Sequence, residues 1–80
     1  MVSINREETG DNIRRLMRKN KVSTFDIMAY LHLTSPTSIY AWTQGRVMPS
    51  ADNLVRLADI FKCTVDDIII VDRDMEGVYE

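Results

Sequence analysis

The chain has 80 residues, of which 45% are hydrophobic and 28% are charged, so we expect a single domain over residues 1–80 with one small core. No segment approaches the ~20 consecutive apolar residues of a membrane span, and the first residues lack the apolar part of a secretion signal. We therefore expect a cytoplasmic protein with no membrane partner. The single cysteine, Cys63, excludes an internal disulfide and a cysteine-based zinc site.

The net charge of −2 conceals an asymmetry along the chain. Residues 1–51 carry seven Lys/Arg and four Asp/Glu, whereas residues 52–80 carry three Lys/Arg and eight Asp/Glu. Five of the basic residues fall within eight positions: Arg14, Arg15, Arg18, Lys19 and Lys21. Because a polyanion responds to the local field rather than to net charge, this run is either a docking surface for nucleic acid or a solvated helix face.

The first helix is predicted from a cap and an apolar stripe. Asn5 and Glu8 have the spacing of a capping box, and the stripe that follows contains Ile13, Leu16 and Met17. Gly10, inside this helix, lowers its intrinsic stability and so is expected to permit close packing against a neighbour. A second helix is predicted to begin at Ser23, with Asp26 as its third residue.

The third helix is predicted from the pair Ser35-Pro36, a cap followed by proline at the first helical position. Ile39 and Trp42 have the spacing of inward residues, which makes Trp42 a core residue rather than a platform for a base, and Gly45 offers a left-handed stop. Two short helices around a tight connection over residues 23–45 have the sequence form of a helix-turn-helix.

Two more helices complete an all-α prediction. Pro49-Ser50 opens a fourth helix, whose inward residues recur at helical spacing, and Thr64 with Asp67 opens a short fifth one. The tail over residues 70–80 either completes the fifth helix or forms a short edge strand. The inward residues of the fourth helix are Leu54, Leu57, Ala58 and Phe61.

The ordered pattern of these residues resembles the lambda-repressor-like, Cro/C1-type (XRE) helix-turn-helix family. The pattern runs from Gly10 to about Ile69, and its pieces are Gly10-x-x-Ile13-Arg14-x-Leu16, Ile27-Met28-x-x-Leu31-x-Leu33-Thr34, Ile39-x-x-Trp42-x-x-Gly45, Pro49-Ser50-x-x-x-Leu54-x-x-Leu57-Ala58-x-x-Phe61 and Val65-Asp66-x-Ile68. The resemblance implies a compact five-helix domain whose recognition helix, about residues 36–43, enters the major groove of double-stranded DNA.

In such a domain the unpacked side of the third helix faces the bases. Hydroxyl groups discriminate weakly between base edges, and the methyl groups of threonine and alanine can meet the thymine methyl. The hydroxyls either read bases or only cap the helix. The expected base-contacting residues are Pro36, Thr37, Ser38, Tyr40 and Ala41.

Phosphate contacts are expected from residues around this helix. The start of the second helix offers free backbone N–H groups and a partial positive charge. Arg14 and Arg18 either reach the phosphates or stay in water. The expected phosphate-contacting residues are Lys21, Ser23, Thr24, Gln44 and Arg46.

These features predict a sequence-specific DNA-binding transcriptional regulator, acting as a repressor and as a homodimer at least on DNA. The apolar segment 68–71 or the exposed part of the fifth helix is the expected dimer surface. We expect no enzymatic activity, no metal and no cofactor, because no nucleophile–base pair or ligand cluster is suggested. The alternative is an antitoxin-like protein-interaction module whose main partner is a protein, which the acidic last third of the chain favours.

Overall fold

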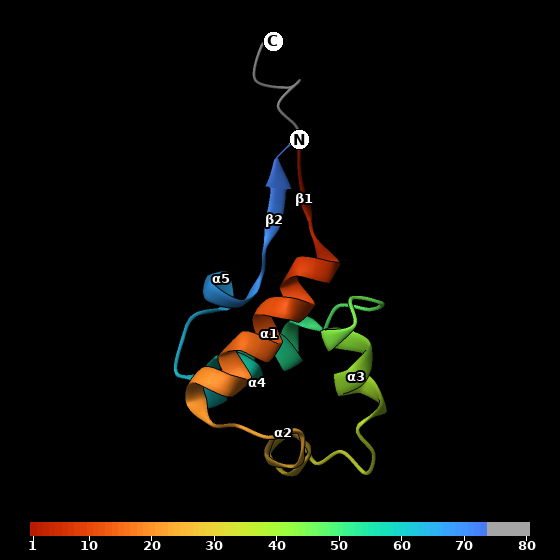
Figure 1. Ribbon diagram of the computed structural model, residues 1–80, viewed down its shortest axis with the longest axis vertical. Helices are drawn as coiled ribbons and strands as arrows, with labels where there is room; N and C mark the ends of the chain where they lie inside the picture. The colour runs from red at the N-terminus through yellow and green to blue at the C-terminus, as the bar shows by residue number, and fades with distance from the viewer. Residues whose placement is uncertain (74–80) are drawn as a thin grey trace.

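The computed structural model describes residues 1–73, which form five helices and a small two-stranded sheet (Figure 1). This arrangement confirms the predicted all-α, lambda-repressor-like architecture. Residues 74–80 of the predicted tail lie outside the described part. In chain order the elements are β1 (Val2–Ile4), α1 (Arg6–Asn20), α2 (Thr24–Leu31), α3 (Thr37–Thr43), α4 (Ala51–Phe61), α5 (Val65–Ile68) and β2 (Val71–Arg73).

Side-chain caps start four of the five helices where the sequence predicts them. Ser23 and Thr64 form complete capping boxes with Asp26 and Asp67, and Ser50 accepts a hydrogen bond from the N–H of Asn53. The fourth cap, Asn5, accepts from the N–H of Glu8 at 2.9 Å. Each cap satisfies an N–H that the helix itself leaves unpaired.

Two details of the predicted helix starts are wrong. The backbone N–H of Asn5 donates to the carbonyl of Ile70 at 2.8 Å, so the box predicted with Glu8 is only half formed. Helix α3 begins one residue later than predicted, because Pro36 takes the cap position and its carbonyl accepts the first helical bond, from the N–H of Tyr40 at 3.0 Å.

One hydrophobic core lies between the helices, and α1 runs diagonally through the middle of the molecule, with α3 and α5 on opposite sides of it (Figure 1). Trp42 is 5% exposed and belongs to this core, as predicted. Every inward residue predicted for α4 is buried as well. The core residues are Ile13, Leu16, Ile27, Ile39, Trp42, Leu54, Leu57, Ala58, Phe61 and Ile68.

The described part of the predicted tail, residues 70–73, contains an edge strand rather than a longer α5. Strand β2 pairs antiparallel with β1 in the register Val2↔Arg73, Ser3↔Asp72 and Ile4↔Val71. The ribbon extends from the N-terminal end of α1, at the opposite end of the molecule from α2 (Figure 1). Because Ile68 is completely buried in the core, it cannot belong to the dimer surface that the sequence suggested at residues 68–71.

Candidate nucleic-acid interface

The N-terminus of α2 presents backbone N–H groups beside a hydroxyl. The Oγ atom of Ser23 accepts from the N–H of Asp26 at 3.1 Å, and the carboxylate of Asp26 accepts from the N–H of Ser23 at 2.8 Å. The next N–H groups, of Thr24 and Phe25, precede the first helical bond, which Ile27 donates to the carbonyl of Ser23. A helix start of this kind attracts phosphate, although the Asp26 carboxylate offsets part of that attraction.

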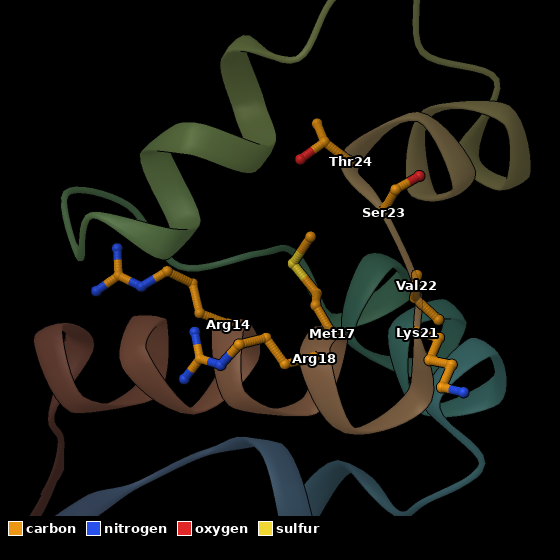
Figure 2. A pocket seen from close by; sticks show the side chains of 7 residues that line it. All are labelled: Arg14, Met17, Arg18, Lys21, Val22, Ser23 and Thr24. Atoms are coloured by element: carbon orange, nitrogen blue, oxygen red, sulfur yellow. The ribbon is translucent and has the colours of Figure 1, made fainter.

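A groove of about 460 Å³ runs between α1 and the start of α2, and cationic and apolar groups line it (Figure 2). Only the left-handed turn at Lys21 (φ 56°) and the next two residues separate the end of α1 from the start of α2. This short link brings Lys21 to the groove beside the cap. The lining residues are Arg14, Met17, Arg18, Lys21, Val22, Ser23 and Thr24.

The groove brings together three of the five residues predicted to contact phosphate, Lys21, Ser23 and Thr24. It also includes Arg14 and Arg18, for which the sequence left two interpretations open. Figure 2 shows the Arg14 side chain extending from α1 toward α3 and the Arg18 side chain lying over α1 next to it, whereas the Lys21 side chain points away from both. The i, i+4 spacing of two arginines predicts a shared helix face, but only the position of the α2 N-terminus relative to α1 shows that this face borders the groove.

A second acidic side chain, besides Asp26, weakens the field at this groove. Arg14 forms an ion pair with Asp11, one helical turn earlier. Both side chains are largely exposed, so the pair contributes little to stability. The Asp11 carboxylate nevertheless lowers the positive potential that a phosphate would meet beside Arg14.

Helix α3 turns its apolar side to the core and its polar side to solvent. Ile39, Trp42 and Thr43 are buried, whereas Thr37, Ser38 and Tyr40 are exposed. The other two predicted base-contacting residues, Pro36 and Ala41, are half-buried. The side chains of Thr37 and Ser38 are therefore accessible to a binding partner. No side-chain hydrogen bond caps α3 at Pro36.

The remaining predicted phosphate contacts, Gln44 and Arg46, lie at the C-terminal end of α3 and do not line the groove. Gln44 is exposed and caps the helix, and Gly45 adopts the predicted left-handed conformation (φ 75°). The reversal lets the N–H of Arg46 donate to the carbonyl of Ala41 at 3.0 Å and leaves the Arg46 side chain exposed. Arg46 thus places a cationic side chain just beyond the C-terminal end of α3.

The titratable groups with clear pKa shifts lie outside this interface. A hydrogen bond to Asp59 raises the pKa of Tyr30, burial raises the pKa of the Cys63 thiol, and hydrogen bonds from Thr64 lower the pKa of Asp67. Within residues 1–73 no group of His, Cys, Asp and Glu has the arrangement of a metal site. No helix in the same range is long and apolar enough to cross a membrane.

In a comparison with known protein families, residues 12–74 match the Cro/C1-type HTH DNA-binding domain. Comparisons with curated proteins and with solved structures give no match. The matched range contains the whole of the groove, the cap at Ser23 and the exposed side of α3. On this match and on its fold, the chain belongs to the family of Cro/C1-type helix-turn-helix DNA-binding domains.

Proposed function

We propose that this domain is a sequence-specific transcriptional regulator that binds double-stranded DNA as a homodimer and acts as a repressor. In this proposal α3 enters the major groove, where Thr37, Ser38 and Tyr40 meet base edges. These residues make none of the strong bidentate base contacts of Arg, Asn or Gln. Much of the specificity is therefore assigned to DNA shape and to the spacing of two half-sites.

The observation that carries the proposal is the groove beside the α2 N-terminus. Arg14, Arg18 and Lys21 line it together with Ser23 and Thr24, next to the N–H groups of Thr24 and Phe25 that precede the first helical bond of α2. Cations and helix N-termini are the groups that position a protein on the phosphate backbone. Arg46, beyond the C-terminal end of α3, supplies a second phosphate contact in this proposal.

Repression is the simplest regulatory outcome for such a domain. Occupation of an operator blocks transcription by competition alone, whereas activation needs a further contact with the transcription machinery. The duplex DNA target also implies that the protein acts inside the cell. No catalytic step is part of the proposal.

Selection of binding sites from random duplex DNA, followed by affinity measurements against salt, tests this function. We expect an enriched inverted repeat or half-site, and an affinity that falls as salt rises because each phosphate contact releases counterions. Arg46→Ala should make the slope of log K against log salt shallower by about 0.9. Arg56→Ala, on the exposed face of α4, is the matched control and should leave the slope unchanged.

A second candidate function is the antitoxin-like role, in which a protein is the main partner. It is favoured by two large apolar side chains that stand in solvent, Phe25 at 78% and Val55 at 61% exposure. If selection enriches no DNA sequence, and Phe25→Ser abolishes co-purification with a basic protein encoded beside this one, the protein-partner function replaces the regulator.

A further inference from the structure

The β1–β2 ribbon exposes apolar side chains that no described element covers. All six strand residues are exposed, and the large ones are Val2 at 51%, Ile4 at 48% and Val71 at 43%. A two-stranded ribbon is only marginally stable in water, and within residues 1–73 both of its edges present unpaired peptide groups. The ribbon therefore has the properties of a surface to which a further strand can be added.

The hydrogen bonds next to the ribbon show which peptide groups face outward. The N–H of Asn5 donates to the carbonyl of Ile70 at 2.8 Å, so the peptide groups of Asn5 face the β2 side. Peptide groups alternate in direction along a strand. Those of Ser3 therefore also face β2, whereas those of Val2 and Ile4 face away from it, at the free edge of β1.

The same alternation assigns the outward groups of the other edge. Ile70 and Asp72 face β1, because Ile70 pairs with Asn5 and Asp72 lies opposite Ser3. The peptide groups of Val71 and Arg73 therefore face away, at the free edge of β2. Each edge thus has two residues whose peptide groups face outward, separated by one residue whose peptide groups face the other strand.

The two edges differ in how well they match a second copy of themselves. An antiparallel pair of β1 strands centred on Ser3 places Val2 opposite Ile4 of the second copy, and hydroxyl opposite hydroxyl. An antiparallel pair of β2 strands centred on Asp72 places two carboxylates directly opposite each other. Apolar cross-strand pairs stabilise a sheet, and like charges directly opposite destabilise it.

We propose that the free edge of β1 is the dimer surface, and that two copies pair there to form a four-stranded antiparallel sheet. We propose this surface in place of the two suggested by the sequence, the segment 68–71 and the exposed part of the fifth helix, and its role on DNA rests on the proposed function. The ribbon lies at the opposite end of the molecule from α2 (Figure 1), so the pairing leaves the α2 N-terminus uncovered. Three strand residues on each side are far fewer than the ~20–30 of a stable interface, so the free dimer is weak.

Sedimentation equilibrium without DNA, at protein concentrations up to about 1 mM, tests the proposal. Ile4→Pro removes an outward N–H of β1 but leaves the bond between Asn5 and Ile70 in place. Val71→Pro is the matched control, because Val71 is the direct partner of Ile4 and its N–H faces outward from β2. We expect Ile4→Pro to weaken the dimer at least about tenfold, and Val71→Pro to leave its dissociation constant within about threefold of the wild type.

Ser3→Lys provides a second variant that does not depend on proline. Within one chain the new ammonium lies opposite Asp72 and supports the ribbon, but across the proposed dimer two ammonium groups oppose each other. We expect a monomer whose thermal midpoint is not below that of the wild type. A wild type that stays monomeric, a Ser3→Lys variant that still dimerises, or equal losses in the two proline variants would overturn the assignment. Because no DNA is present, these results stand apart from the site selection that tests the proposed function.

Discussion

At the scale of single residues, two glycines set the distance between α1 and α3. A Cβ atom added at Gly10 would lie 2.5 Å from the carbonyl oxygen of Trp42 and 2.6 Å from that of Thr43. A Cβ atom at Gly45 would lie 2.7 Å from the Cα atom of Glu7, and its φ of 75° is a conformation that other residues rarely adopt. At both glycines the backbone of α1 is therefore in direct contact with the backbone of α3 or of the turn that follows it. These contacts fix the position of the exposed side of α3 relative to the arginines of α1.

Gly10→Ala tests this contact. Alanine raises helix propensity by ~1 kcal/mol over glycine, but inserting a methyl group into a packed contact costs about 1–3 kcal/mol. Because the atoms in the way are backbone carbonyls, we expect the cost to exceed the gain, with a lower midpoint of urea unfolding and weaker DNA binding. Lys19→Ala, on the exposed side of the same helix, is the control. A midpoint equal to or above the wild-type value would contradict the contact.

The carboxylate of Asp67 links stability to acid pH. It accepts a hydrogen bond from the backbone N–H of Thr64 at 3.0 Å, and this bond, with that of the Thr64 hydroxyl, holds the pKa of Asp67 below its ordinary value. A lowered pKa means that the stabilisation is complete above the ordinary aspartate pKa and disappears as pH falls through the lowered one. We expect Asp67→Asn to flatten the acid limb of a plot of unfolding free energy against pH. Parallel limbs for the two proteins would show that the bond contributes nothing.

At the scale of elements, the sequence predicts the features that local signals determine, but not those that depend on tertiary contacts. The starts of α1, α2, α4 and α5 follow from caps that act within four residues, and the sequence predicts all four. Strand β1 has no such signal, because three exposed residues become a strand only when β2 lies beside them. Likewise, Lys21 and Ser23 are predictable as neighbours in sequence, whereas the place of Arg14 and Arg18 at the groove depends on how α1 packs.

Polar residues on the inward side of α1 dock the segment that follows α4. The Nδ2 atom of Asn12 donates to the carbonyls of Asp67 at 2.8 Å and Ile68 at 2.9 Å, which are among those that α5 leaves unpaired at its end. The hydroxyl of Thr9 accepts from the N–H of Ile70 at 2.9 Å. The apolar stripe of α1 predicts its core contacts, but it contains no sign of these polar ones, because their partners lie more than 50 residues away.

Asn12→Ala tests this docking. It removes a buried amide and leaves two carbonyls without their donor, and an unsatisfied buried group costs about 1–3 kcal/mol. We expect a loss of that size in urea unfolding. Arg15→Ala, which removes only the bond from the Arg15 side chain to the Asn12 oxygen, should cost less. Equal losses in the two variants would mean that the carbonyls of α5 do not depend on Asn12.

At the scale of the whole molecule, the position of a charge should matter more than the total of −2. Asp11 forms an ion pair with Arg14, which lines the groove, whereas Asp66 lies in the first turn of α5. Figure 1 shows α5 and α3 on opposite sides of α1. At physiological salt, exposed charges farther apart than ~8 Å are largely screened from each other. The field at the groove should therefore depend on Asp11 and hardly at all on Asp66.

Asp11→Asn and Asp66→Asn change the net charge by the same amount, so comparing them separates local field from total charge. We expect Asp11→Asn to raise DNA affinity about twofold to fivefold at low salt, because it removes a repulsive charge beside the phosphates. Asp66→Asn should leave the affinity unchanged in the same titration. If net charge governed binding, the two variants would gain equally. If neither variant gained, the phosphates would lie away from Arg14, and the groove between α1 and α2 would not be the surface that carries the DNA.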